Sequence, residues 1–362
     1  MLVKTNYLKL EKPFVTEGRR ELKEAIVAYE EYGKKDGPVV FIAHGGLSSM
    51  HAAGKHSEDD KQSGFWDWLI GPGKTIDTNR YRVLCTNALG SMFGSCSPLT
   101  TNPDTGKIYG ASFPKTTLVD QVRFQKAFLD QLGVNELHLM LGPSMGSLHT
   151  LTMAALYPEF VKAIISIATA GRTPPPALTV HHFMMNAIKL DPQFKEGKYD
   201  TEEPLNNLRL IYQLSKFFYT AEAVIKEATW DSVSQGPEAQ YKRSDNVNAY
   251  LSAGQEERIR QWDPNSMISV LSAINTHDLG RDASSYEEGV QRINCPVLLM
   301  NMDTDGEFQP CWAQEVANII NEKQPGQARA EVITSKWGHL GCLFETKQLG
   351  DHIKSFISHH EL

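Results

Sequence analysis

The feature that most constrains the fold is a series of short apolar runs separated by segments of helical periodicity. Five runs have the length of buried strands, and most are bounded by Gly, Pro, Asn or Asp: Val39–Ala43, Tyr81–Thr86, Leu137–Leu141, Val161–Ala168 and Pro296–Met302. Helical patterns lie between them, notably over Leu118–Leu132 and Met145–Tyr157. Strands that alternate with helices predict a mostly parallel sheet covered on both faces, so the predicted class is α/β.

The stretch from about Gly171 to Arg292 has a different pattern. It is helical and amphipathic, it opens on three consecutive prolines, and it contains no convincing strand. The strand–helix rhythm resumes at Cys295. We expect residues 1–170 and 293–362 to form the core, and residues 171–292 to form a helical lid over the carboxyl ends of the strands, where open sheets bind ligands. A separate helical domain without a role at the site is the alternative.

Charge and apolar patterning exclude two classes of partner. The 362 residues include 43 acidic and 36 basic side chains, which gives a net charge of −7 without long runs of one sign. Nucleic-acid binding needs a concentrated basic face, which this sequence lacks. No apolar run approaches the roughly 18 residues of a membrane span, and residues 1–14 lack the pattern of a signal peptide. We therefore expect a cytoplasmic protein.

Neither the cysteines nor the histidine-rich loop predicts a metal site. The cysteines are odd in number and lack a CxxC spacing, so we expect reduced thiols at Cys85, Cys96, Cys295, Cys311 and Cys342. Cys342 lies three residues after His339 and is an alternative nucleophile, although a small packed thiol is the better interpretation. The histidine-rich loop is expected to be solvated, and its polar residues are His51, His56, Glu58, Asp59 and Asp60. No metal and no cofactor is predicted.

The strongest chemical motif is Gly142-Pro143-Ser144-Met145-Gly146. It follows the apolar run Leu137–Leu141 and opens a helical pattern, which is the context of a nucleophile elbow. A tight strand-to-helix turn projects the serine hydroxyl at the helix N-terminus, where backbone N–H groups can meet a developing oxyanion. Ser144 is therefore the candidate nucleophile.

A nucleophilic serine needs a base and a third group that orients the base. With this type of elbow the acid and then the histidine should follow the serine along the chain. The run Pro296–Met302 leads into Asp303 and Asp305, and either residue can be the acid. His339 is the candidate base, because it lies in a glycine-containing loop after the last predicted strand, Ala330–Thr334.

The oxyanion hole should combine two backbone amides. One is the amide of Met145, directly after the nucleophile. The other should come from the loop after the first core strand, here His44-Gly45-Gly46-Leu47. Gly46 and Leu47 are both candidate donors, and the sequence does not choose between them. Removing one such donor typically costs about 3 kcal/mol of transition-state stabilisation.

Beyond these motifs, the chain resembles the homoserine O-acetyltransferase family of the α/β-hydrolases over nearly its whole length. The matching segments are Ile76–Tyr81, Asn87–Gly90, Asn102–Lys107, Tyr109-Gly110 and Phe113-Pro114. Two longer ones run from Asp120–Val122 to Leu132-Gly133 and from Asp191-Pro192 to Tyr199. The family's late motif, Thr-Asp-x-x-Phe-x-Pro, is matched by Thr304–Pro310, and this match selects Asp305 as the acid.

The resemblance implies an α/β-hydrolase core with a helical lid, and a homodimer that forms through the lid. It also implies a two-stage reaction in which Ser144 takes an acyl group, usually acetyl, and passes it to an acceptor. His339 would act as base and then as acid, while Asp305 would hold its tautomer.

The sequence departs from the family at functional positions. Leu340 follows His339 where the family has an aspartate that pairs with the amino group of homoserine. No clear equivalent of the family's carboxylate-binding lid arginine is found, although Arg209 and Lys216 lie nearby. A buried ammonium without its carboxylate loses a bond of about 1.5–3 kcal/mol. Pro143 and Ser147 also replace glycines that the family favours beside the elbow.

These departures favour a carboxylic-ester hydrolase of small acetyl-type esters, in which water accepts the acyl group. The alternative is an O-acetyltransferase that acts on homoserine or another alcohol and uses acetyl-CoA as co-substrate. A third interpretation, a binding protein that retains the fold without catalysis, is disfavoured by the complete set of Ser144, Asp305 and His339.

Overall fold

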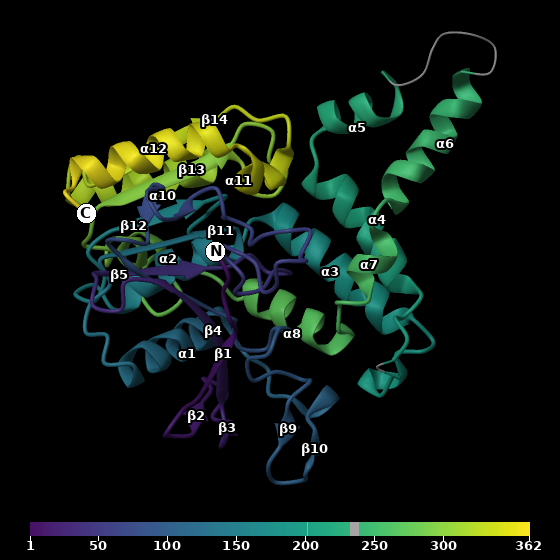
Figure 1. The fold of residues 1–362 in the computed structure, drawn as a ribbon, viewed down its shortest axis with the longest axis horizontal. Helices are drawn as coiled ribbons and strands as arrows, with labels where there is room; N and C mark the ends of the chain where they lie inside the picture. The colour runs from purple at the N-terminus through teal and green to yellow at the C-terminus, as the bar shows by residue number, and fades with distance from the viewer. Residues whose placement is uncertain (201, 232–238) are drawn as a thin grey trace.

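The computed structural model describes residues 1–200, 202–231 and 239–362, and its centre is an eight-stranded sheet (Figure 1). In spatial order the strands are β1 (Asn6–Lys9), β4 (Ile26–Gly33), β8 (Arg82–Thr86), β5 (Val39–Ala43), β11 (Leu139–Pro143), β12 (Ile164–Ile167), β13 (Val297–Met302) and β14 (Ala328–Ile333). All neighbours from β8 to β14 are parallel, while β4 pairs antiparallel with β1 and β8. The predicted α/β class with a mostly parallel sheet is confirmed.

The helices of the core pack on both faces of this sheet. They are α1 (Leu118–Gln131), α2 (Met145–Leu156), α9 (Tyr286–Val290), α10 (Pro310–Lys323), α11 (Gly341–Phe344) and α12 (Thr346–His359). Alternate strand residues point to opposite faces and fill two apolar layers. Leu141 and Met300 lie in one layer together with α12, whereas Met140 and Leu299 lie in the other with α1 and α10.

The loops of the core contain short strands and 3₁₀ turns. Three two-stranded ribbons comprise β2 (Phe14–Val15) with β3 (Glu21–Leu22), β6 (Ile70–Gly71) with β7 (Ile76–Asp77), and β9 (Thr101–Asn102) with β10 (Lys107–Ile108). Two single 3₁₀ turns are η1 (Gly110–Ser112) and η3 (Gly338–Leu340). The second of these turns carries His339.

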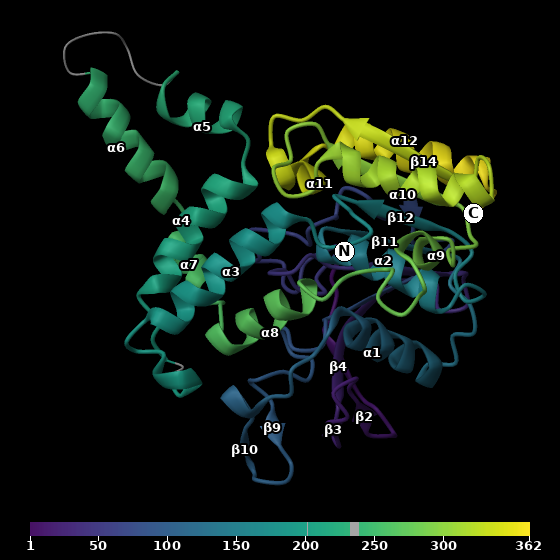
Figure 2. The same ribbon diagram turned by 180° about the vertical axis from the view of Figure 1, so that it is seen from behind.

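All named elements in the described part of the chain between β12 and α9 are helices, joined by loops. It contains α3 (Pro175–Leu190), η2 (Lys195–Gly197), α4 (Asn207–Tyr219), α5 (Glu222–Thr229), α6 (Ala239–Ser252), α7 (Gln255–Ile259) and α8 (Pro264–Ile274). α3 and α8 lie against the core, whereas α6 extends away from it at one end of the molecule (Figures 1 and 2). Within the described ranges, none of the helices combines the length and apolar character needed to cross a bilayer.

The antiparallel edge of the sheet was not among the predicted strands, because glutamates interrupt the apolar pattern of β4. Glu30 is nevertheless fully buried there and contacts the imidazoles of His51 and His56. The expectation of a solvated loop therefore holds for His56, whose side chain is 46% exposed, but not for His51, whose side chain is 17% exposed. Glu58 and Asp59, in the same loop, are exposed as expected.

The connection from β11 to α2 depends on two glycines that allow close backbone contact. A Cβ atom on Gly142 would lie 2.6 Å from the carbonyl oxygen of Ala43, and one on Gly146 would lie 2.1 Å from the same oxygen. Because no carbon atom fits at these separations, only glycine lets α2 begin against the end of β5. The neighbouring Pro143 and Ser147 are accommodated without this restriction.

We expect Gly146→Ala to lower the free energy of unfolding by about 1–3 kcal/mol or to prevent folding, because the added methyl group overlaps a backbone carbonyl that cannot rotate away. Urea unfolding followed by circular dichroism measures the change. Gly18→Ala is the matched control, since a Cβ there would meet only the Thr16 hydroxyl at 3.7 Å. Equal stability of the two variants would contradict the packing described for the elbow.

Candidate active site

Ser144 lies at the turn between β11 and α2 in a strained backbone conformation. Its φ of 55° and ψ of −127° place a non-glycine residue in a region that costs of order 1–3 kcal/mol. The turn is held by neighbouring backbone groups: the amide of Ser144 donates to the Ile167 carbonyl at 2.9 Å, and its carbonyl accepts from the Ser147 amide at 2.8 Å. The surrounding sheet and helix thus fix the direction of the hydroxyl.

The structure brings Ser144 together with His339 and Asp305, which come from distant parts of the chain. The Ser144 Oγ atom lies 2.9 Å from His339 Nε2, and His339 Nδ1 lies 2.8 Å from Asp305 Oδ2. The other oxygen of Asp305 accepts from the amides of Glu307 and Phe308. This carboxylate is therefore fixed in orientation, and the arrangement allows the imidazole to accept the hydroxyl proton.

The two aspartates after β13 have different partners. Asp303 Oδ1 accepts a hydrogen bond from the Ser335 amide at 2.9 Å, so this carboxylate holds the loop that precedes His339. Only Asp305 of the two contacts the imidazole. The contact between Asp305 and His339 agrees with the match to the family motif, which favoured Asp305 over Asp303 as the acid.

Three backbone amides at the elbow and in the loop after β5 make no hydrogen bond within the described structure. Among the residues that the structure describes, the N–H groups of Gly46, Leu47 and Met145 have no hydrogen-bond partner. A Cβ on Gly46 would lie 3.9 Å from the Met145 Cβ, so the loop after β5 abuts the start of α2. The Leu47 carbonyl accepts from the guanidinium of Arg258 at 2.5 Å. Both loop amides thus remain available as oxyanion donors.

His44 has a structural role in the same loop. Its Nε2 accepts from the Ala88 amide at 2.9 Å, and its Nδ1 lies 2.7 Å from the Gly45 carbonyl. Burial lowers the pKa of His44 to about 4, so the ring is neutral at physiological pH. This neutral ring joins the loop after β5 to the loop after β8.

A second carboxylate, which the sequence reasoning missed, lies beside the imidazole. Glu307 is 3% exposed, and its Oε2 atom lies 3.4 Å from His339 Nε2, the nitrogen that faces the serine. Its Oε1 atom lies 3.2 Å from Nε2 of His181 on α3, and His181 Nδ1 lies 2.7 Å from Asn275 Oδ1. Glu307 occupies a variable position of the late motif, so only the three-dimensional structure reveals its contacts with His339 and His181.

These carboxylates determine the protonation of His339. Burial disfavours the imidazolium, but the negative charges of Asp305 and Glu307 outweigh burial and raise the pKa of His339 to about 9. The ring is therefore largely protonated at neutral pH. Proton acceptance from Ser144 becomes more favourable as the pH rises toward this value.

Helices from the middle of the chain complete the surroundings of the imidazole. The ring of Tyr219, at the end of α4, lies 5.3 Å from the His339 ring between centroids. A Cβ on Gly338, whose φ is +63°, would lie 2.8 Å from the Ala221 amide. The segment between β12 and α9 thus contacts the site directly, through α3 and through the end of α4.

The other residues singled out from the sequence have different surroundings. Cys342 is buried, and burial raises the pKa of its thiol well above the ordinary value, as expected for a packed thiol. Arg209 forms an ion pair with Glu256 at 2.7 Å on an exposed helix surface. Lys216 donates to the Tyr250 carbonyl and lies over the Tyr250 ring.

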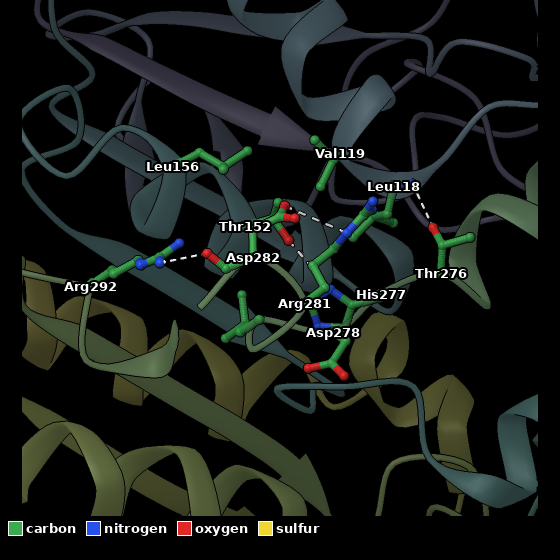
Figure 3. Close-up of a pocket in the computed structure, with 11 residues that line it drawn as sticks. Leu118, Val119, Thr152, Leu156, Thr276, His277, Asp278, Arg281, Asp282 and Arg292 are labelled. Carbon is green, nitrogen blue, oxygen red and sulfur yellow. Dashed lines mark hydrogen bonds and ion pairs between the residues drawn. The ribbon is translucent and has the colours of Figure 1, made fainter. Parts of the chain in front are cut away.

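Two pockets elsewhere in the described structure contain none of the triad residues. The first, of about 20 Å³, lies beside α1 and is lined in part by Thr152, His277, Asp278 and Arg281 (Figure 3). It has room for about one water molecule and is too small for a substrate. The second, of about 220 Å³, lies on the helical segment beside Tyr199 and Trp262.

Comparison with known proteins agrees with this fold. Residues 38–346 match the family described as the alpha/beta hydrolase fold. The chain is 34% identical to the homoserine O-acetyltransferase of Moorella thermoacetica, over 98% of this chain and 96% of that protein. It is 33% identical to the homoserine O-acetyltransferase of Methanococcoides burtonii, over 99% of this chain and 74% of that protein.

Two solved structures superpose over nearly the whole chain. A homoserine O-acetyltransferase from Bacillus anthracis gives a TM-score of 0.91 at 28% identity, covering 99% of this chain and 98% of its own. Esterase E22 gives a TM-score of 0.87 at 28% identity, covering 98% of this chain and 100% of its own. The chain is therefore an enzyme of the α/β-hydrolase superfamily that belongs to the homoserine O-acetyltransferase-like family.

Proposed function

We propose that this enzyme transfers an acetyl group through Ser144 from an acetyl thioester, acetyl-CoA, to the hydroxyl of an amino-bearing acceptor of the homoserine type. The relatives described above that share about a third of its residues carry the name homoserine O-acetyltransferase. The observation that carries the proposal is the position of Glu307 beside the imidazole.

In the proposed first half-reaction, Ser144 Oγ attacks the acetyl carbonyl while its proton passes to His339 Nε2. The tetrahedral oxyanion is stabilised by the amide of Met145 and by one amide of the loop after β5. Protonated His339, held by Asp305, then donates the proton to the departing thiolate. In the second half-reaction the acceptor hydroxyl gives its proton to His339 as its oxygen attacks acetyl-Ser144, and the proton finally returns to Ser144.

Glu307 supports an acceptor that carries an ammonium group. The sequence favoured hydrolysis because Leu340 removes the carboxylate that would pair with the amino group. Glu307 offers another carboxylate for this role, since it lies 3.4 Å from the same imidazole and has no Lys or Arg partner among the described residues. A charge-assisted bond from an acceptor ammonium to this carboxylate would contribute about 1.5–3 kcal/mol.

Hydrolysis of small acetyl-type esters is the second candidate. The specific observation in its favour is Leu340, a partly buried apolar side chain directly after His339. The similarity to esterase E22, at a TM-score of 0.87, gives it a precedent in the same fold. In this case water, rather than an alcohol, attacks acetyl-Ser144.

We further propose that residues 171–292 act as a lid over the site and that two copies of the chain pair through it. The contacts of His181 and Tyr219 with the site support a lid role. Leu210 and Phe217 of α4, which are 58% and 63% exposed, offer apolar surface for a partner copy.

Substitution of Glu307 should separate the two candidate functions. In Glu307→Gln we expect the KM for homoserine, in the presence of acetyl-CoA, to rise about 10- to 150-fold, because the ammonium loses its carboxylate. Acetylation of the enzyme by p-nitrophenyl acetate at pH 8 should be unchanged or faster, because the base is less protonated. Ser144→Ala should reduce both reactions by roughly 10³-fold or more.

Glu256→Gln, which removes an exposed carboxylate of the helical segment, is the matched control and should leave both rates unchanged. Rapid hydrolysis of p-nitrophenyl acetate by the wild type without homoserine-dependent thiol release from acetyl-CoA would contradict the transferase and favour the hydrolase. An unaltered KM in Glu307→Gln would refute the role given to this carboxylate.

The pH dependence follows from the protonation of His339. The imidazole acts as a base only when neutral, so kcat/KM for p-nitrophenyl acetate should rise with pH and level off above about 9, the pKa of His339. In Glu307→Gln the midpoint should move to lower pH, because one of the two carboxylates that raise this pKa is gone. Stopped-flow rates between pH 6 and 10 measure the profile, and identical midpoints for the two enzymes would count against the proposed electrostatics.

A further inference from the structure

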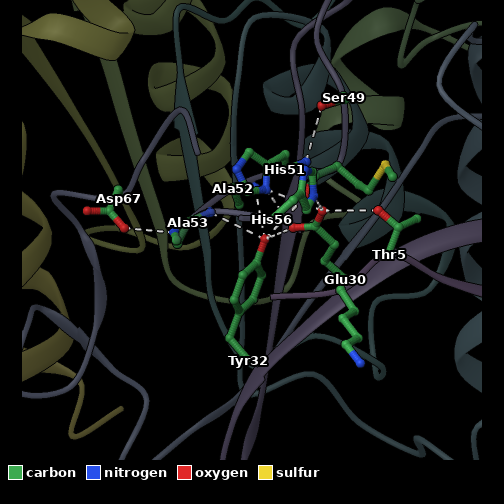
Figure 4. A network of polar contacts seen from close by, with 12 residues as sticks. Thr5, Glu30, Tyr32, Ser49, His51, Ala52, Ala53, His56 and Asp67 are labelled. Carbon is green, nitrogen blue, oxygen red and sulfur yellow. Dashed lines mark hydrogen bonds and ion pairs between the residues drawn. The ribbon is translucent and has the colours of Figure 1, made fainter. Parts of the chain in front are cut away.

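A second cluster of titratable side chains joins the antiparallel edge of the sheet to the loop after β5 (Figure 4). Its centre is Glu30 of β4, which is fully buried. The Oε1 atom of Glu30 lies 2.6 Å from His56 Nε2, and Oε2 lies 3.0 Å from His51 Nδ1. The two imidazole rings lie 4.1 Å apart between centroids. None of the triad residues takes part in this cluster.

From this geometry we propose that Glu30, His51 and His56 bind a divalent first-row metal ion, with Zn²⁺ as the ion best suited to the site. Two imidazole nitrogens and one carboxylate oxygen form a donor set that zinc and related ions prefer. One ligand atom of each residue lies within 4.8 Å of the other two. Ligand atoms around a tetrahedral zinc lie about 3.4 Å apart, given bonds of about 2.0–2.2 Å. The contacts of Glu30 with His56 and His51, at 2.6 Å and 3.0 Å, would therefore have to lengthen by less than about 1 Å.

The environment of Glu30 favours a cation between the three side chains. Among the described residues, its ion-pair partners are only the two histidines, and no Lys or Arg neutralises it. A buried carboxylate requires compensating charge. Imidazoles supply that charge only when they are protonated, whereas a bound dication supplies it while the rings remain neutral.

Neighbouring residues form hydrogen bonds that fix the side chains of the proposed ligands, as is usual around metal sites. The Tyr32 hydroxyl donates to Glu30 Oε2 and accepts from the Ala52 amide at 2.9 Å, which ties the strand to the loop. The His51 side chain is 17% exposed, whereas the His56 side chain is 46% exposed. His56 therefore lies on the path by which an ion would enter, and a water molecule can complete the coordination from that side.

The position of the cluster gives the proposed ion a structural role. His51 lies four residues after Leu47, a candidate oxyanion donor, and the intervening chain has no regular secondary structure. An ion held by Glu30, His51 and His56 would fasten this loop to β4 and restrict its motion. The proposal does not depend on the function proposed for Ser144, because it concerns folding and metal content.

Zinc titration of the full-length protein, purified with a chelator and then dialysed, tests the site. We expect isothermal titration calorimetry to show uptake of about one Zn²⁺ per chain, an increase in Tm on addition of Zn²⁺, and no comparable response to Mg²⁺. The His51→Gln/His56→Gln double variant, whose amides can still hydrogen-bond to Glu30 and preserve the fold, should bind Zn²⁺ at least about tenfold more weakly. Circular dichroism verifies that this variant is folded.

Two further variants locate the ion. His359→Gln/His360→Gln alters the other pair of adjacent histidine rings, 4.7 Å apart at the C-terminus, and should bind Zn²⁺ like the wild type. His339→Asn alters the triad and should also retain binding. The proposal is overturned if the wild type binds no Zn²⁺, if the folded His51→Gln/His56→Gln variant binds it equally well, or if either of the other variants abolishes binding.

Discussion

The hydrogen bond between Ser144 Oγ and His339 Nε2 is the interaction on which the active site depends. It requires a serine in a backbone conformation that ordinary residues avoid, at the end of a buried parallel strand. The sheet supplies this position, because Gly142 and Gly146 allow β11, α2 and the end of β5 to meet at separations that exclude a Cβ atom. Packing energy from the surrounding core therefore maintains the strain that exposes the hydroxyl.

The electrostatics of the site are set by two carboxylates that act on one imidazole. Asp305 contacts the nitrogen remote from the serine, whereas Glu307 approaches the nitrogen that faces the serine hydroxyl. Together they favour the imidazolium over the neutral ring, despite burial. A cationic acceptor near Glu307 would offset part of this negative charge and so release His339 to act as a base. Under the proposed function, acceptor recognition and proton transfer are therefore linked through a single side chain.

Much of the fold, the candidate nucleophile Ser144 and the candidate base His339 followed from local sequence patterns, because those patterns reflect local physics. The apolar run before Gly142 became β11. The choice of Asp305 over Asp303 came instead from the resemblance of Thr304–Pro310 to the family's late motif, and the structure brings Asp305 to His339. Glu307 was missed because its contacts with His339 and His181 join segments that are far apart in the chain. The surroundings of His51 were misjudged for a related reason, since it contacts Glu30 of β4, a strand whose glutamates make its sequence look polar.

Direct detection of acetyl-Ser144 tests the central claim most sharply. Brief incubation with acetyl-CoA, acid quenching and peptide mass spectrometry should find one acetyl group on the peptide that contains Ser144, and added homoserine should discharge it. A modified Cys342, or turnover without any acetylated serine, would contradict the account.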